Sequence, residues 1–323
     1  MDYRLAIQSA LIENVLFLDG LSRAGKFLLG KIVSNFQKVD YFQAAEIIEH
    51  IPILHYLGCM ERNDAIAFLR LNTNLNIYNR SVGRNLNLRE SDGSSLRNAT
   101  NYDDYIQRTV EPDGMAAVTK LKTGKKIPSF LTHECLPHME LFFDTFPDLL
   151  MINIQRHPVD IAHSWFVRRW GERFGTDPLA FIPVIQGKRI PVPWFADSWI
   201  DEYEAMPPVE RVIKSICYLA DLDKKAYESN YRKDQILLVS YENLFSDPET
   251  VISQIGKFLT SDPFPNMNDV FKREGCPRDL PLKERKRKFT ELSKLTNSKT
   301  VVNELVTSGI EYEKKWGIES FLY

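Results

Sequence analysis

Near its start the chain carries an apolar strand that leads through a glycine-bounded loop into a helix, VLFLDGLSRAGKFLLGKIVSN over residues 15–35. Gly20 and Gly25 permit backbone angles that a Cβ atom would forbid, and the helix N-terminus adds partial positive charge. Arg23 and Lys26 supply full charges. Backbone N–H groups therefore converge on one anion site, as in a phosphate-binding loop.

The loop departs from an ordinary nucleotide triphosphatase loop at one position. It matches G-x-x-x-x-G-K, but Phe27 stands where such a loop has the Ser or Thr hydroxyl that ligates magnesium. A kinase using ATP and magnesium also needs an acidic strand end, whereas the candidate strands finish Gln155-Arg156 and Ser240-Tyr241. The loop indicates an anionic ligand that needs no metal, and the kinase is the alternative hypothesis.

Strand and helix signals alternate along the chain. Their order predicts an α/β fold, a three-layer P-loop-type domain with a central parallel β-sheet flanked by helices. Two later apolar strands are expected in the centre of the sheet beside the first, each followed by a helix that begins near a proline. After the first strand, the predicted elements are a helix at 26–36, an extended segment at 39–42, a helix at 44–50, strands at 149–155 and 236–240, and helices near Pro158 and Pro248.

Length and composition predict one domain over residues 1–323, because 44% hydrophobic residues suffice for a large core. Residues 60–115 contain an asparagine-rich stretch with few apolar anchors, which we interpret as an insertion or lid. Residues 165–205 are rich in tryptophan and phenylalanine and form a second insertion. These aromatic side chains either pack in a core or form a binding surface.

Charge and cysteine content exclude several classes of protein. A formal net charge of -2 does not favour nucleic-acid binding. The four cysteines are far apart and form no C-x-x-C pair, which argues against a zinc site. No apolar run approaches the roughly 18 residues that span a bilayer, so no membrane span is expected and a cytoplasmic location is the default.

A second candidate element lies at the end of the strand at 149–155. Loops at the carboxyl ends of parallel strands converge on ligands, and Arg156 occupies such an end. Ser164 follows about two turns into the next helix. A positive charge at this place favours an anion, and the alternative is a structural ion pair of Arg156 with Asp160 or another carboxylate.

With these segments in place, the chain resembles the sulfotransferase family, whose members transfer the sulfuryl group of 3'-phosphoadenosine 5'-phosphosulfate (PAPS) to hydroxyl or amine acceptors. FLDGLSRAGKFLL is similar to the family's 5'-phosphosulfate loop, with Arg23 where a lysine is usual. INIQRHPVDIAHSWF is similar to its 3'-phosphate motif. ILLVSYENLFSDPETVISQIGKFL resembles its later strand and turn, with Tyr241 near the nucleotide. The resemblance covers roughly residues 13 to 260.

The resemblance implies a donor site and a metal-free reaction that leaves adenosine 3',5'-bisphosphate. Arg156 and Ser164 are expected to hold the 3'-phosphate and to distinguish PAPS from ATP. Either Arg23 or Lys26 is expected to meet the leaving oxygen. The expected donor-loop residues are Ser22, Arg23, Ala24, Gly25, Lys26, Phe27 and Leu28.

Many family members close the 3'-phosphate site with a late R-K-G loop, which this chain lacks. The nearest substitute is KERKRK at residues 283–288, from which Lys286 and Arg287 are candidate donor contacts. The alternative is a solvated helix face.

The candidate general base lies in SFLTHECLPHMELFFDTFPDLL, which resembles the family's K-T-H-L-P segment. His133 matches the family's histidine, and an imidazole is suited to take the acceptor's proton. Glu134 is the rival base, because glycan-modifying members often use a carboxylate. His133 is otherwise a hydrogen-bonded histidine at a strand end.

The acceptor is expected to be a sugar or glycan hydroxyl, and a small phenol or alcohol is the second hypothesis. Residues 165–205 would supply the acceptor surface. From a different class, the chain is a catalytically inactive nucleotide- or glycan-binding module of the same fold. The sequence leaves the oligomeric state open.

Overall fold

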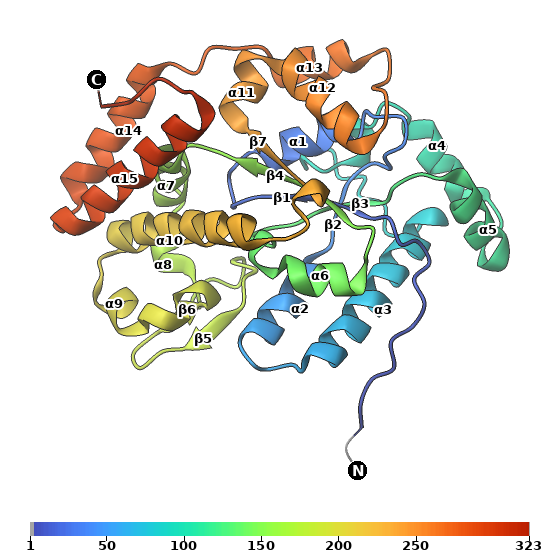
Figure 1. Cartoon of the computed structure of the whole chain (residues 1–323), viewed down its shortest axis with the longest axis horizontal. Helices are drawn as coiled ribbons and strands as arrows, with labels where there is room; N and C mark the ends of the chain where they lie inside the picture. The colour runs from blue at the N-terminus through green and yellow to red at the C-terminus, as the bar shows by residue number, and fades with distance from the viewer. Residues whose placement is uncertain (1–2, 323) are drawn as a thin grey trace.

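The computed structural model describes residues 3–322, with a five-stranded parallel sheet of order β2-β3-β1-β4-β7 at its centre (Figure 1). Both β3 and β4 run parallel to β1, and the strand order reverses at β1. In parallel sheets, ligands bind at the carboxyl edge where such a reversal occurs. This arrangement confirms the predicted α/β class. The strands are β1 (Leu16–Asp19), β2 (Gln43–Ala44), β3 (Ser129–Leu131), β4 (Leu150–Gln155) and β7 (Ile236–Ser240).

Helices cover both faces of the sheet, so the domain has three layers. Successive side chains of β1 point to opposite faces: Leu16 and Leu18 join one hydrophobic core and Phe17 the other. In Figure 1, α1 and α12 lie above the sheet and α2, α3 and α6 below it. These helices are α1 (Lys26–Val33), α12 (Pro248–Leu259), α2 (Glu46–Tyr56), α3 (Arg62–Ser81) and α6 (Met139–Thr145).

A group of longer helices packs at one side of the sheet, where α7 and α15 both contact α10 and α14 contacts α7. No helix of the described residues is long and apolar enough to cross a membrane. The remaining elements are α4 (Tyr102–Gln107), α5 (Gly114–Gly124), α7 (Pro158–Phe166), α8 (Trp170–Arg173), β5 (Val184–Gln186), β6 (Pro191–Pro193), α9 (Ile200–Ala205), α10 (Pro208–Ser229), α11 (Tyr241–Ser246), α13 (Met267–Glu274), α14 (Leu282–Leu295) and α15 (Lys299–Trp316).

The two later strands form nearly as predicted, and Pro158 and Pro248 are the first residues of α7 and α12. Only β4 is central, however, because β7 is one of the two edge strands of the sheet. The apolar run of β7 reflects its packing against helices rather than strands on both sides. Helix α1 ends at Val33 instead of residue 36, because the N–H groups of Asn35 and Phe36 turn back to the carbonyls of Ile32 and Val33.

The extended segment predicted at 39–42 forms only an isolated parallel bridge, between Val39 and Ile127, and the strand β2 begins later, at Gln43. Side chains already occupy the backbone donors of that segment: Tyr105 Oη accepts from the Tyr41 N–H at 2.6 Å, and Ser34 Oγ accepts from the Phe42 N–H at 3.0 Å. Those groups cannot also form a strand ladder. Helix α2 begins two residues later than predicted and continues to Tyr56.

Part of the predicted lid belongs to the core. Helix α3 buries Ala65, Leu69 and Ile77 in the core shared with α2 and α6. An insertion or lid stays a prediction for the loop after Ser81, where a Cβ atom on Gly93 would lie 3.2 Å from Phe27 Cγ.

Of the two alternatives for the aromatic segment at 165–205, core packing describes most of its large side chains. Its largest side chains are almost fully buried and pack edge to face or tilted against one another, because large apolar rings gain most by leaving water. The buried members include Trp165, Trp194, Phe195 and Tyr203.

Candidate active site

The loop after β1 is pressed between Tyr241 and the end of β4. Gly25 precedes α1 with φ 111°, and a Cβ atom there would lie 2.5 Å from Tyr241 Cδ2. Gly20 has φ 144°, and its Cβ atom would lie 2.3 Å from the carbonyl oxygen of Ile154. Both glycines are therefore required by backbone angle and by space. The bare backbone of the loop forms the cradle that an anion needs at the N-terminus of α1.

Lys26 holds the loop from beneath. Its ammonium group is buried and donates to the carbonyls of Gly20 at 2.8 Å and Leu21 at 2.9 Å. Burial lowers the pKa of Lys26, and the nearby Glu134 and Asp19 partly restore it. The charge therefore faces the loop's own carbonyls, which leaves Arg23 as the exposed cation of the loop.

Three guanidinium groups converge above the loop. Arg23 Nε donates to Ser164 Oγ at 3.3 Å, Arg168 Nη1 donates to the same oxygen at 3.0 Å, and Arg156 Nη1 donates to the Arg23 carbonyl at 3.0 Å. Burial and the charges of Arg168 and Arg156 lower the pKa of Arg23. Within the described chain, no carboxylate lies within 4 Å of any of the three. Such a cluster favours an anion of high charge.

The structural ion pair of Arg156 with Asp160 is absent from the structure. Asp160 instead accepts from Arg285 Nε at 3.0 Å and from Lys288 Nζ at 2.5 Å. Arg156 lies over the Tyr241 ring, 4.3 Å from its centroid, and its Nε is buried without a partner. An orphaned buried donor of this kind fits the oxygen of a bound phosphate.

Arg278 joins the same site, and sequence reasoning missed it. Its Nη2 donates to Tyr241 Oη at 3.1 Å, and its guanidinium lies 4.2 Å from the centroid of the Phe245 ring. Arg278 lies in the turn between α13 and α14, ahead of the basic run. In the sequence, Arg278 is a single cation in a late loop, and it belongs to no motif whose spacing would identify it.

The basic run 283–288 is part of α14 and divides into two faces. Arg285 is buried between Asp160 and Glu242, 3.0 Å from each. The predicted contact Arg287 is exposed and forms ion pairs with Glu284 and Glu291 on its own helix, which is the solvated-face alternative. The run therefore contacts α7 and α11 through Arg285 and Lys288. A phosphate contact of Lys286 stays a prediction.

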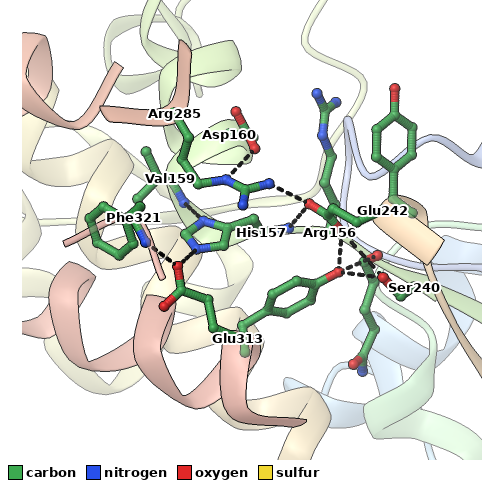
Figure 2. A network of polar contacts seen from close by, with 12 residues as sticks. Arg156, His157, Val159, Asp160, Ser240, Glu242, Arg285, Glu313 and Phe321 are labelled. Atoms are coloured by element: carbon green, nitrogen blue, oxygen red, sulfur yellow. Dashed lines mark hydrogen bonds and ion pairs between the residues drawn. The ribbon is translucent and has the colours of Figure 1, made fainter. Parts of the chain in front are cut away.

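A buried network ties the turn after β4, which carries Arg156, to the C-terminal helices (Figure 2). Glu242 accepts from the N–H of His157, from Arg285 and from Tyr312 Oη. Glu313 lies 3.3 Å from His157 Nε2 and accepts from the N–H of Phe321. The backbone that carries Arg156 is thereby held by α11, α14 and α15 together.

Glu134, the rival base, is turned toward the donor loop. The turn after β3 gives it φ 51°, and its Oε1 accepts from the Ser22 N–H at 2.8 Å. Burial raises the pKa of Glu134, while the charges of His133 and Lys26 lower it. This carboxylate is occupied in holding the loop.

His133 points to the opposite side, toward α2. Its Nδ1 lies 3.0 Å from Glu49 Oε1, and its side chain is 32% exposed. Of the two candidate bases, His133 is therefore the one that an acceptor can approach.

Asp19 fixes the turn that carries both candidates, and sequence reasoning missed it as well. The buried carboxylate accepts from Thr132 Oγ1 at 2.9 Å, from Asn153 Nδ2 at 3.0 Å and from the N–H groups of Cys135 and Leu136 at 3.1 Å. The strand signal LFLD ends in this residue, but nothing local shows where its partners lie.

The other predicted loop residues occupy several environments. The Ser22 carbonyl accepts from Trp165 Nε1 at 2.9 Å, and Ala24 is buried beneath the loop. Leu28 is half-buried against the core. Phe27 is 43% exposed in the first turn of α1, so no hydroxyl stands at the usual magnesium position.

The family model described as "Sulfotransferase domain" matches residues 14–267 of the chain. Among solved structures, the sulfotransferase domain from the curacin biosynthetic pathway shares 10% identity and a TM-score of 0.48, over 96% of this chain and 99% of that chain. A sulfotransferase from Alicyclobacillus acidocaldarius shares 15% identity and a TM-score of 0.43, over 94% and 96%. The sulfotransferase domain of the Synechococcus PCC 7002 olefin synthase shares 12% identity and a TM-score of 0.47, over 99% of this chain and 100% of that chain. No curated protein sequence matches the chain.

Proposed function

The chain belongs to the sulfotransferase family, which makes it an enzyme of PAPS-dependent sulfuryl transfer, and we propose that it sulfates a hydroxyl group of a small acceptor. The observation that carries the donor half is a cluster of three arginines without a carboxylate partner among the described residues. Arg23 and Arg168 both donate to Ser164 Oγ, and Arg156 donates to the Arg23 carbonyl. PAPS carries a phosphate at the 3' position and a phosphosulfate at the 5' position of its ribose, and the three arginines complement this negative charge.

In this proposal the donor lies across the carboxyl edge of β1 and β4. The loop N–H groups at the start of α1 hold the 5'-phosphosulfate, as at other helix N-termini. Arg156 and Ser164 hold the 3'-phosphate, and Arg278 extends the same cationic surface past Tyr241. The unpartnered Nε of Arg156 supports this assignment. The 3'-phosphate contacts would discriminate against ATP.

The transfer step follows from these positions. The acceptor oxygen forms a bond to sulfur while the bond from sulfur to the 5'-phosphate oxygen breaks in line. The electron pair of that bond leaves with adenosine 3',5'-bisphosphate, where Arg23 balances the developing charge. The acceptor's proton passes to His133. Lys26 and Glu134 stabilise the conformation of the loop and contact neither the acceptor oxygen nor the leaving oxygen.

A cavity of about 220 Å³ beside the turn that carries His133 is the proposed acceptor site. Pro52 and the half-exposed ring of Tyr56 line it from α2, and Pro137 and His138 line it from the turn. Its volume lies below the roughly 300 Å³ at which pockets for drug-sized ligands begin. We therefore favour a single sugar ring or a small alcohol, with the Tyr56 ring as a stacking face.

Thermal shifts test the donor half. Adenosine 3',5'-bisphosphate is expected to raise the melting temperature more than ATP with magnesium, because only the ligand that fits stabilises the fold. A larger shift with magnesium ATP would favour the kinase hypothesis. A shift without any sulfuryl transfer to a panel of sugars, phenols and alcohols would favour the inactive binding module.

Two variants test the base. His133→Ala is expected to abolish transfer while the shift with the bisphosphate survives. Glu134→Gln keeps an acceptor oxygen for the Ser22 N–H and is expected to retain transfer. The opposite result would make Glu134 the base.

A further inference from the structure

Glu49 on α2 and His133 in the turn after β3 form a close pair, and the same helix and turn line the proposed acceptor site through Pro52 and Pro137. His133 Nδ1 lies 3.0 Å from one carboxyl oxygen of Glu49 and 3.2 Å from the other. Glu49 belongs to α2 and is 9% exposed, between the core residues Ile48 and Ile51. His133 Nε2 makes no hydrogen bond within residues 3–322. One ring nitrogen is therefore held by a carboxyl group, and the other is free for an acceptor.

We propose that Glu49 is the positioning residue of His133 and that its carboxylate decides which ring nitrogen carries the proton. The proposal rests on the proposed role of His133 as the base. A neutral imidazole has one N–H and one acceptor nitrogen, and the partner of Nδ1 selects between the two tautomers. An ionised Glu49 accepts only, so Nδ1 carries the proton and Nε2 presents its lone pair to the acceptor hydroxyl.

A proton on Glu49 reverses this arrangement. A protonated carboxyl group donates to Nδ1, and the ring proton then rests on Nε2, where no lone pair remains for the acceptor. The 3.0 Å contact between His133 Nδ1 and Glu49 Oε1 is therefore compatible with two tautomers of His133. In one of them Nε2 can take the acceptor's proton, and in the other it cannot. The pair changes between them by gaining or losing one proton.

The charges around the pair come from every element packed against it. Lys26 faces it from α1, Asp19 from β1 and Glu134 from the turn, while Glu46 and His50 lie on α2 itself.

These surroundings set where the shared proton resides. Burial raises the pKa of Glu49 to about 8, although the charge of Lys26 opposes it. Burial and the charge of Lys26 lower the pKa of His133 to about 4. The imidazole is therefore neutral at pH 7, and the extra proton rests on Glu49. The form that can accept a proton increases as the pH rises through about 8.

Histidine tautomers can be followed by NMR without any transfer assay. The chain contains six histidines, so ¹⁵N-histidine labelling gives a sparse spectrum, and His133→Asn identifies the signals of His133. We expect the proton to lie on Nε2 below about pH 8 and on Nδ1 above it. In Glu49→Gln this change should be absent between pH 6 and 9. An identical titration in wild type and Glu49→Gln would overturn the proposal.

Kinetics give the second readout. With PAPS as donor, the wild-type kcat is expected to rise through about pH 8. Glu49→Gln should lower kcat by about 10²-fold and flatten this rise, while the KM for PAPS stays within about twofold. Glu49→Asp keeps the charge and should restore the pH dependence in part. The matched control is Glu61→Gln at the exposed start of α3, away from the charges around the pair, which should behave as wild type.

The outcomes separate this proposal from the proposed function. If the bisphosphate does not bind, or if His133→Ala keeps the wild-type rate, the proposed function or the base assignment fails. If His133→Ala loses transfer while Glu49→Gln keeps both the wild-type rate and pH profile, only the positioning role of Glu49 fails.

Discussion

The guanidinium of Arg156 donates a 3.0 Å hydrogen bond to the main-chain carbonyl of Arg23, although 133 residues separate the two. This bond joins the end of β4 to the loop after β1. The two regions that are proposed to bind the two phosphates of the donor are therefore parts of one assembly. A change in either region is expected to affect how the other holds the ligand.

Arg156→Ala is expected to weaken binding of adenosine 3',5'-bisphosphate by about 10- to 100-fold, because a lost charged hydrogen bond is worth roughly 1.5–3 kcal/mol. Affinity for adenosine 5'-monophosphate should fall less, since that ligand has no 3'-phosphate. Isothermal titration calorimetry measures both. Arg169→Ala is the control, because Arg169 is exposed and paired with Glu172. Equal losses for both nucleotides would argue against a 3'-phosphate site at Arg156.

Gly25→Ala is expected to lower the free energy of unfolding by about 2 kcal/mol or more. The substitution forces an alanine to φ 111° and brings its Cβ atom to 2.5 Å from the Tyr241 ring. Gly124→Ala, which has no atom within 4 Å of the added Cβ, should leave stability unchanged or slightly higher. Urea unfolding compares the two. Similar stability of both variants would contradict the described loop geometry.

Lys26→Met is expected to lower the stability of the protein, whereas Arg23→Met is expected to lower its transfer rate. Without the Lys26 ammonium, two loop carbonyls lose their donor, so the free energy of unfolding should fall by about 2 kcal/mol. Arg23→Met should stay within about 0.5 kcal/mol of wild type. Its transfer rate should fall by about 10²-fold or more, because the leaving oxygen loses its cation. Chemical unfolding and single-turnover transfer separate the two, and a stable but slow Lys26→Met would reverse the assignment.

Arg285→Met is expected to cost about 3–5 kcal/mol of stability, because it leaves Asp160 and Glu242 buried without their shared cation. Arg287→Met lies two positions away on the exposed side of α14 and should change stability by less than about 0.5 kcal/mol. Denaturant midpoints measure the difference. Equal effects would show that the network of Figure 2 contributes little.

Acid should remove part of the stability through Asp160. Burial alone would raise its pKa, but Arg285 and Lys288 lower it from 3.8 to about 2. Because the folded pKa lies below the unfolded one, this stability is present above about pH 4 and is lost as the pH falls toward 2, by about 2 kcal/mol. In Asp160→Asn this part of the pH dependence should be missing. Parallel pH profiles of unfolding for both proteins would contradict it.

Features that depend on neighbouring residues were predictable from the sequence. The glycine spacing around Arg23 and the apolar runs of β4 and β7 are local signals, and the structure contains all three elements. The segment at 39–42 forms only the bridge of Val39 with Ile127, because Tyr105, far along the chain, occupies the backbone donor of Tyr41. The edge position of β7 is likewise a property of strand order, which no local pattern contains.

The sequence by itself determined the α/β class, the donor loop and the resemblance to sulfotransferases, because backbone angles and apolar periodicity are set over a few residues. Only the tertiary structure decided that Lys26 turns inward, that Arg168 and Arg278 join the cationic site, and that His133 meets Glu49. Long side chains adopt the direction that burial, hydrogen bonds and nearby charge permit. Their partners come from segments that lie far apart in the sequence and meet only when the sheet and its helices have packed.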